Sequence, residues 1–249
     1  GGTNSMFELL KRLDRERFAV TCCFYKDYRK GRDGRLLSEE LADIGIPLVL
    51  LHPGKQPLWA KLAKEVIRGI FAWSPRLKKM GVLGVDVQWR IKPRVVALRQ
   101  ALGDGAFELL YMNNQPSSNL EGYLAGEAAG LPVVQHCRIE PTLQANEVAV
   151  VNRVATRIIC VSQGVADVLA AQHVADSRLR VVYNAIDSRA PLPPAVELPA
   201  TLNGLVIGTV GQLTARKGVL HLLQAVANLK AEGLAVSCLI LGEGPQRAE

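Results

Sequence analysis

Two adjacent cations, Arg216 and Lys217, stand in a short loop between a predicted strand and a predicted helix. The strand is the apolar run 205–210, which we expect to be buried, and apolar residues recur at helical spacing over 219–230. A second apolar run, 236–241, completes a β-loop-α-β unit. The loop of such a unit meets the N-terminus of its helix, where free N–H groups and the helix dipole favour an anion. Phosphate binding is the chemistry that these cations indicate, and solvated surface cations are the alternative.

A histidine is the second residue that can do chemistry. His136 ends the apolar run 131–136, which predicts a strand. Open α/β sheets bind ligands beyond the carboxyl ends of their strands. His136 is therefore a candidate for contact with a ligand, and a histidine hydrogen-bonded within a loop is the alternative. Glu140 is the nearest carboxylate, but proximity alone does not make it catalytic.

The third candidate is an amphipathic, basic helix predicted over 58–73. Its apolar face consists of Leu58, Leu62, Val66, Ile70 and Trp73, flanked by Trp59 and Phe71. Its other face carries Lys61, Lys64, Glu65 and Arg68. Such a helix can lie on an anionic bilayer, with its basic side chains extended toward the surface. The alternative is a helix that packs its apolar face on the core and leaves its basic face in solvent.

The positive charge of the chain is concentrated around this helix. Between Lys55 and Arg99 there are eleven Lys or Arg residues and two acids, whereas the net charge of the whole chain is +7. Such a region attracts nucleic acid, anionic lipid or a charged substrate, and composition does not choose among them. Nucleic acid is disfavoured, because aromatic residues make up only 5% of the chain and no RNA-binding, helix-turn-helix or finger pattern occurs.

The composition bounds the class of protein. A chain of 249 residues with 49% hydrophobic residues suits one large or two medium domains with a sizeable core. No apolar run approaches the roughly 18 residues of a membrane-spanning helix, and no charged-then-apolar stretch suggests a secretion leader. The five cysteines include no CxxC pair and no Cys/His spacing for zinc. We therefore expect a cytoplasmic protein with reduced thiols and no metal site.

Strands and helices are predicted to alternate before residue 188, which favours a parallel sheet covered on both faces. The strands are expected at 18–24, 46–51, 107–112, 131–136, 157–162 and 179–183. The helices are expected at 6–13, 36–44, 58–73, 119–129, 148–155 and 163–171. Asn4 or Ser5 should cap the first helix. The stretch 188–203 contains four prolines without periodicity, which is typical of a linker.

The residues around the two cations resemble a known family. Three segments follow one another here: Gly211-Gln-Leu-Thr-Ala-Arg-Lys-Gly218, then Leu223-Gln-Ala225, then Leu239-Ile-Leu-Gly-Glu-Gly-Pro245. Together they are similar to the start of the donor domain of retaining group-one glycosyltransferases of the GT-B fold, the glycosyl transferase family-four type. The family pattern is V-G-R-L-x-x-x-K-G, then L-x-x-A, then L-x-x-x-G-x-G-P. The resemblance is specific here, moderate over 131–187 and weak before that.

The resemblance also implies roles for single residues. The family's Lys and Arg of the first motif hold the diphosphate of a nucleotide-sugar donor. The Lys matches Lys217, whereas Gln212 stands where the family has Arg, and Arg216 is the nearby candidate to replace it. His136 resembles the His of P-x-V-x-x-H, which reaches the donor sugar. Gly1-Gly2 resembles a Gly-Gly turn near the donor phosphates, although two terminal glycines are also typical of a cloning remnant.

The implied fold is α/β of the GT-B type. Residues 1–187 would form an acceptor-side, Rossmann-like, parallel-sheet domain whose first strand is missing, and 188–203 the Pro-rich linker. Residues 204–249 would begin a second Rossmann-like domain, the nucleotide-sugar donor-binding domain, with its first β-α-β. The family's paired glutamates would lie beyond Glu249. We therefore expect that residues 1–249 alone do not turn over.

The implied function is transfer of a hexose from a nucleoside-diphosphate sugar to an acceptor hydroxyl with retention, in cell-surface glycan or glycolipid synthesis. No metal or other cofactor is required. The expected partners are the nucleotide-sugar donor, a glycan or lipid-linked acceptor, and an anionic membrane surface on the cytoplasmic side, without nucleic acid. The membrane-contact residues would be Trp59, Lys61, Lys64 and Arg68. A sugar-nucleotide epimerase of similar shape is one alternative, and a non-catalytic membrane-docking domain, which Gln212 favours, is another.

Overall fold

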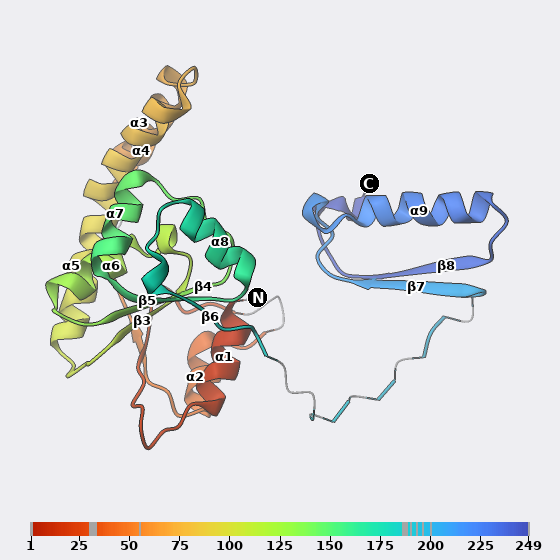
Figure 1. Cartoon of the computed structure of the whole chain (residues 1–249), viewed down its shortest axis with the longest axis horizontal. Coiled ribbons are helices and arrows are strands. Elements are labelled where there is room, and N and C mark those ends of the chain that lie inside the picture. Colours follow the sequence, from red (N-terminus) through yellow and green to blue (C-terminus); the bar gives the residue numbers. More distant parts are fainter. Residues whose placement is uncertain are drawn as a thin grey trace. The chain divides into compact units, whose positions relative to one another are not determined.

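The computed structural model describes residues 2–29, 34–54, 56–185, 189, 191–192, 194–195, 197–199 and 201–248. The chain forms two compact units, Gly1–Ile186 and Asp187–Glu249 (Figure 1). Gly1 lies outside the described residues. So do residues 187 and 188, which flank the predicted domain boundary.

The first unit is built on two parallel sheets. The larger one has the strand order β3-β4-β5-β6, and its strands are Leu110–Asn114, Val133–Cys137, Ala155–Cys160 and Leu179–Val181. The smaller sheet pairs β1, Cys22–Phe24, with β2, Leu48–Leu50. Every described strand pair of this unit is parallel, as the alternation of strands and helices predicts.

Most helices of the first unit lie against these sheets, whereas α3 and α4 project away from them (Figure 1). The α-helices are α1 Gly2–Arg12, α2 Leu37–Asp43, α3 Leu58–Ile70, α4 Pro75–Asp86, α5 Lys92–Gly103, α6 Leu120–Ala128, α7 Ala145–Val154 and α8 Gln163–Ala171. Short 3-10 helices occur at Pro116–Ser118 and Asp176–Arg178. A π-helical segment, Val87–Ile91, joins α4 to α5, so that residues 75–103 are helical throughout.

Several boundaries differ from the sequence prediction. The first helix begins at Gly2, so the prediction of a cap at Asn4 or Ser5 is wrong. The first strand covers Cys22–Phe24 rather than 18–24, because only three residues pair with β2. Helices α4 and α5 were not expected at all. Ser74 caps α4 with its hydroxyl, which accepts a hydrogen bond from the N–H of Leu77 at 3.4 Å.

The main core of the first unit lies between the larger sheet and its helices. Tyr123 of α6, Val133 of β4, Ile158 of β5 and Leu169 of α8 are fully buried and belong to one apolar cluster. Strands β4 and β5 are central in the sheet, so their side chains meet helices from neighbouring segments. The packing of this cluster holds β4 and β5 in place against the helices.

A buried amide ties the carboxyl ends of β3 and β4 together. The side chain of Gln135 is fully buried, and its Nε2 donates to the carbonyl oxygens of Met112, at 3.3 Å, and Asn114, at 3.1 Å. Its Oε1 accepts from Asn119 Nδ2 at 3.1 Å and from the Tyr123 hydroxyl at 3.3 Å. Both polar ends of this buried side chain are therefore satisfied, as burial requires.

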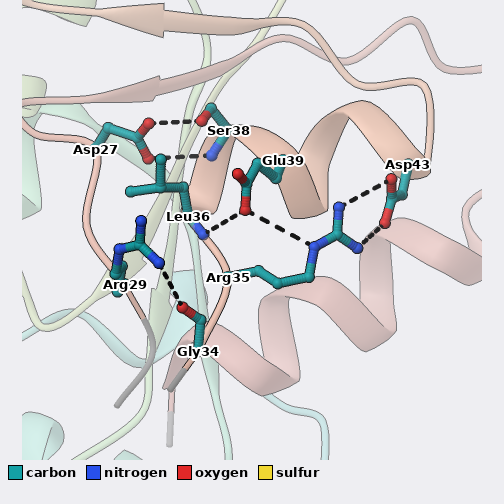
Figure 2. A network of polar contacts seen from close by, with 8 residues as sticks. All are labelled: Asp27, Arg29, Gly34, Arg35, Leu36, Ser38, Glu39 and Asp43. Atoms are coloured by element: carbon teal, nitrogen blue, oxygen red, sulfur yellow. Dashed lines mark hydrogen bonds and ion pairs between the residues drawn. The ribbon is translucent and has the colours of Figure 1, made fainter. Parts of the chain in front are cut away.

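Helix α2 is held by the loop that follows β1 (Figure 2). Asp27 of this loop accepts hydrogen bonds from the backbone N–H of Ser38, at 3.1 Å, and from its hydroxyl, at 2.5 Å. These bonds lower the pKa of Asp27, the hydroxyl having the larger effect. Arg35 pairs with Asp43 at the other end of the helix. The sequence specifies no role for this loop, and the structure shows that it anchors α2 to the smaller sheet.

The second unit is the predicted β-loop-α-β. Strand β7, Leu205–Val210, pairs in parallel with β8, Val236–Leu241, and helix α9, Val219–Ala231, connects them. Short 3-10 helices lie at Ala215–Lys217 and Pro245–Ala248. The expectation that β7 is buried is wrong: Leu205 is 64% exposed and Val210 is 82% exposed. Among the described residues of this unit, α9 is the one α-helix that packs on the sheet, so the sheet is covered on one face.

The Gln135 network leads to a stability prediction. Gln135→Leu removes the amide and leaves the Tyr123 hydroxyl and the carbonyl of Met112 buried without their partner. Unsatisfied buried groups cost about 1–3 kcal/mol each, so we expect the free energy of unfolding to fall by about 2–4 kcal/mol. Urea denaturation measures this loss. Gln163→Leu, on the exposed first turn of α8, is the matched control, and an equal loss in both variants would contradict the role of the network.

Candidate functional site

Polar side chains gather at the carboxyl edge of the larger sheet. Asn113 of β3 and His136 of β4 are register partners, so their side chains lie on the same face of the sheet. Tyr111 lies two residues before Asn113, and Arg138 lies two residues after His136. The Tyr111 hydroxyl forms a short hydrogen bond with His136 Nδ1, and Arg138 Nη2 lies 3.3 Å from the same nitrogen. His136 therefore sits in a polar cluster at the sheet edge.

The cluster determines the tautomer of His136. A guanidinium can only donate hydrogen bonds, so the contact from Arg138 requires an unprotonated Nδ1. The proton of the neutral ring then resides on Nε2. His136 is 9% exposed, and its Nε2 is buried without a hydrogen-bond partner among the described residues. The ring thus offers one unused N–H donor.

The charge state of His136 follows from the same surroundings. Burial, and next the charge of Arg138, lower the pKa of His136 from 6.5 to about 4. The imidazole is consequently neutral at physiological pH. A neutral ring with a free N–H can orient a hydroxyl or carbonyl oxygen of a ligand, and it is a poor general acid.

Arg138 is a residue that the sequence reasoning missed. Its Nε donates to Asn113 Oδ1 at 2.6 Å and its Nη1 to Asn184 Oδ1 at 3.1 Å. Burial lowers the pKa of this half-buried guanidinium, and within the described ranges no carboxylate pairs with it. A cation held by neutral partners retains its full attraction for an anionic ligand. The signal in the sequence was its spacing, two residues beyond His136 on the same edge.

Gly2 lies beside this cluster. The Asn113 side chain donates to the carbonyl oxygen of Gly2 at 3.4 Å, and a Cβ added to Gly2 would lie 3.4 Å from the Arg138 side chain. Gly2 is also the first residue of α1, whose initial N–H groups have no partner within the helix. The structure thus places Gly2 beside Asn113 and Arg138, which belong to the cluster around His136. Its predicted companion, Gly1, lies outside the described residues.

The predicted phosphate loop belongs to the second unit. Arg216 and Lys217 form a 3-10 turn that runs into Gly218, whose φ of +68° is left-handed and which caps α9. Both cations and Gln212 are exposed, and in the part of the chain that the structure describes no ion pair involves the two cations. Their charges and the first N–H groups of α9 therefore lie at one helix N-terminus.

The Gly-x-Gly-Pro motif of residues 242–245 supports this loop. The backbone N–H of Leu213 donates to the carbonyl of Glu243 at 3.0 Å, and that of Gln246 donates to the carbonyl of Leu213 at 3.1 Å. A Cβ on Gly242 would lie 1.8 Å from the carbonyl oxygen of Gly211, so a side chain cannot fit there. The glycines of 242–245 are thus explained by the close approach of two loops.

The predicted membrane-contact residues lie on α3, but they do not share one environment. Lys61 is exposed, and Arg68 is exposed and pairs with Glu65. Lys64 is instead 14% exposed and forms a 2.9 Å ion pair with Asp86 of α4. Lys64 therefore does not share the exposed surface of Lys61 and Arg68, because the inner side of α3 packs on α4.

The apolar face of α3 is turned to solvent. Trp73 is 75% exposed and Leu62 is 65% exposed, and Trp59 makes an edge contact with Trp89 at 4.8 Å between ring centroids while remaining about half exposed. The alternative in which this face packs on the core is thus contradicted. No helix among the described residues is long and apolar enough to cross a membrane.

A cleft of about 620 Å³ opens at the base of α3. It lies beyond the carboxyl ends of β1 and β2, and it is lined by Lys26, Pro53, Gly54, Gln56, Pro57, Leu58, Lys61, Trp89, Arg90 and Arg94. Arg94 is paired at 3.0 Å with the buried carboxylate of Glu121, which also accepts a hydrogen bond from the Tyr25 hydroxyl at 3.0 Å. The lining contains four cations and no acid. Arg90 and Arg94 are paired with Asp86 and Glu121, so Lys26 and Lys61 are the cations that favour an anionic ligand.

The architecture and these sites define a GT-B glycosyltransferase fold: a parallel α/β unit with polar residues at its sheet edge, and a β-loop-α-β with a basic helix N-terminus. Residues 1–189 match the family described as Glycosyltransferase Family 4. The chain belongs to this family.

Similar proteins are known at the level of sequence and of structure. The chain is 31% identical over 245 residues to 2-deoxystreptamine glucosyltransferase of Streptomyces kanamyceticus, covering 86% of this chain and 63% of that relative. The chain therefore spans less than two thirds of this relative. Anabaena Alr3699/HepE, solved with UDP and glucose, matches with a TM-score of 0.60 and 16% identity over 98% of this chain and 58% of that one. Acinetobacter baumannii MurG matches with a TM-score of 0.51 and 14% identity over 97% and 62%.

The pKa of His136 can be tested directly. We expect NMR titration to show a neutral imidazole down to about pH 5, since its pKa is about 4. The unfolded chain takes up this proton near pH 6.5, so His136 lowers folding stability as the pH falls from 6.5 toward 4. Arg138→Gln should raise the pKa of His136, because it removes a nearby positive charge. Arg157→Gln, at an exposed arginine of β5, is the control, and an unchanged pKa in Arg138→Gln would refute the coupling.

Proposed function

We propose that this protein transfers a hexose from a nucleoside-diphosphate sugar to an acceptor hydroxyl, with retention at the anomeric carbon. The observation that carries the proposal is the pair of exposed cations at the N-terminus of α9, within a chain of Glycosyltransferase Family 4. Support comes from a relative named a glucosyltransferase and from a structural neighbour solved with UDP-glucose. The proposed setting is synthesis of cell-surface glycan or glycolipid on the cytoplasmic side of a membrane.

The loop before α9 has the chemistry that a departing diphosphate needs. Negative charge builds up on the diphosphate as the bond to the sugar breaks, and preorganised positive groups stabilise that charge. Lys217 and the free N–H groups of α9 would provide them, and Arg216 would take the place of the arginine that Gln212 replaces. Hydrogen bonds to a charged group contribute about 1.5–3 kcal/mol each, so a single lysine makes a measurable difference.

The edge of the larger sheet would position the sugar. His136 would donate its Nε2 proton in a hydrogen bond to a sugar oxygen, while Tyr111 and Arg138 hold the ring in that tautomer. Such positioning accelerates transfer by fixing the reacting groups in line. The proposal requires neither a protein nucleophile nor a metal ion.

Calorimetric titration of UDP and GDP into the full-length protein tests the donor site. We expect one nucleotide to bind, and Lys217→Ala to weaken that binding at least about tenfold, which corresponds to the loss of one charged hydrogen bond. Lys230→Ala, at the exposed far end of α9, is the matched control. Equal affinity of the two variants for the nucleotide would show that the diphosphate does not bind at this loop. Failure of a folded protein to bind either nucleotide would favour the non-catalytic docking domain.

A further inference from the structure

Helices α3 and α4 form a hairpin (Figure 1), and the cleft of about 620 Å³ opens at its base. Its walls come from three segments of the chain: Lys26 follows β1, Gln56 follows β2, and Trp89 belongs to the π-helical segment. Neighbouring parallel strands end at the same edge, which is where open α/β sheets bind ligands. Small-molecule sites have volumes of about 300–1,000 Å³. The cleft is therefore placed and sized for a small ligand.

Two cations of the lining shape the cleft. Arg94 pairs with the buried Glu121 at 3.0 Å, and its guanidinium lies 4.4 Å from the centroid of the Tyr25 ring. Arg90 pairs with Asp86 at 3.4 Å. Protein carboxylates therefore neutralise both arginines and hold them in the wall of the cleft, so that the charge a ligand can use comes from the two lysines of the lining.

Three groups of the lining are free to contact a ligand. Lys26 and Lys61 are exposed, and within the described residues no acid pairs with either of them. Gln56 Oε1 accepts a hydrogen bond from Lys64 Nζ at 3.2 Å, and because an ammonium group only donates, this bond fixes the orientation of the amide. Gln56 Nε2 is a buried donor without a partner in the part of the chain that the structure describes. Buried polar groups are normally hydrogen-bonded, so this donor is available to a ligand atom.

The π-helical segment adds an aromatic ring to the cleft. Trp89 is partly buried, and it makes an edge contact with Trp59 at 4.8 Å between ring centroids. π-Helical turns are rare and are frequently found at functional sites. The C–H groups of a sugar ring form a flat apolar face, which packs well on an indole. An indole beside two free ammonium groups therefore matches a sugar that carries negative charge.

We propose that this cleft binds the acceptor of the glycosyl transfer and that the acceptor is an anionic saccharide. Its sugar ring packs on Trp89, and its phosphate or carboxylate group contacts Lys26 and Lys61. Gln56 Nε2 donates to a neighbouring hydroxyl. The inference rests on the proposed function, because transfer requires a second substrate besides the donor. The exposed cations at the N-terminus of α9 account for the donor diphosphate, and the cleft of the first unit is left for the acceptor.

The anionic group of the acceptor serves recognition and takes no part in the bond changes. An acceptor hydroxyl oxygen bonds to the anomeric carbon of the donor, the bond between that carbon and the diphosphate oxygen breaks, and the hydroxyl proton passes to the released diphosphate. Lys26 and Lys61 are thus specificity-determining residues. They attract a sugar with a negative group, and they repel an amino sugar, whose charge is positive.

Ligand-observed NMR titration of the full-length protein tests the cleft, without nucleotide and again with saturating nucleotide. We expect glucose 6-phosphate or glucuronate to bind about tenfold more tightly than glucose, a preference that added salt reduces. Glucosamine should bind more weakly than glucose, and inorganic phosphate, which lacks the ring, more weakly than glucose 6-phosphate. The proposal is overturned if neither anionic sugar binds more tightly than glucose, or if inorganic phosphate binds as tightly as both.

A pair of double variants tests the two lysines. Lys26→Gln with Lys61→Gln changes only exposed side chains, and circular dichroism verifies that the protein is folded. It should lower the affinity for the anionic sugar about tenfold and leave the affinity for glucose unchanged. Lys11→Gln with Lys230→Gln is the matched control, because it removes the same charge from exposed lysines that do not line the cleft. Equal affinities of the two double variants for the anionic sugar would contradict the role of the lysines.

Failure of this inference can be told apart from failure of the proposed function. A protein that binds UDP or GDP through Lys217 but binds neither anionic sugar keeps the donor site, and only the acceptor cleft is refuted. A folded protein that binds an anionic sugar but neither nucleotide would overturn the acceptor role of the cleft together with the proposed transfer.

Discussion

The amide of Gln135 is the interaction on which the arrangement of the first unit depends. It lies at the point where β3 and β4 end, and it holds backbone carbonyls of one strand while its own strand carries His136. The carbonyl of Asn114 that it fixes belongs to a residue with a φ of +100°, which an L-residue seldom adopts. Strand ends usually fray into loops, but here a buried, fully bonded side chain defines both ends. The sheet edge near His136 is therefore held by hydrogen bonds within the protein itself.

The second unit was largely predictable from the sequence, because its signals are local. Strands β7 and β8 coincide with mainly apolar runs, and Gly218 and Gly233 mark the two ends of α9. The burial of β7 was not predictable, since burial depends on what covers a strand and not on the strand itself. The contact between the loop of residues 211–218 and the loop of residues 242–245 was not predictable either. Only the folded structure shows that Gly242 approaches the backbone of Gly211.

The polar cluster around His136 could not be predicted from the order of the residues alone. His136 could be singled out because it ends a strand, but Tyr111 and Arg138 acquire meaning only from the register of β3 with β4. The hairpin shows a different limit. Its amphipathic pattern was correct, yet the pattern alone does not say which face meets the protein. Helix α4 continues through a π-helical segment into α5, which contains Pro93, and a proline inside a run is a signal against a helix, so these helices were not anticipated.

The placement of the indole rings has a spectroscopic consequence. The chain has three tryptophans, Trp59, Trp73 and Trp89, and all of them lie in the hairpin or in the π-helical segment at its base. Trp59 and Trp89 touch each other, whereas Trp73 stands in solvent near the tip. Intrinsic tryptophan emission from this protein thus reports on one structural element alone. The emission wavelength depends on the polarity around Trp73, and the quenching of the emission depends on the contact between the other two rings.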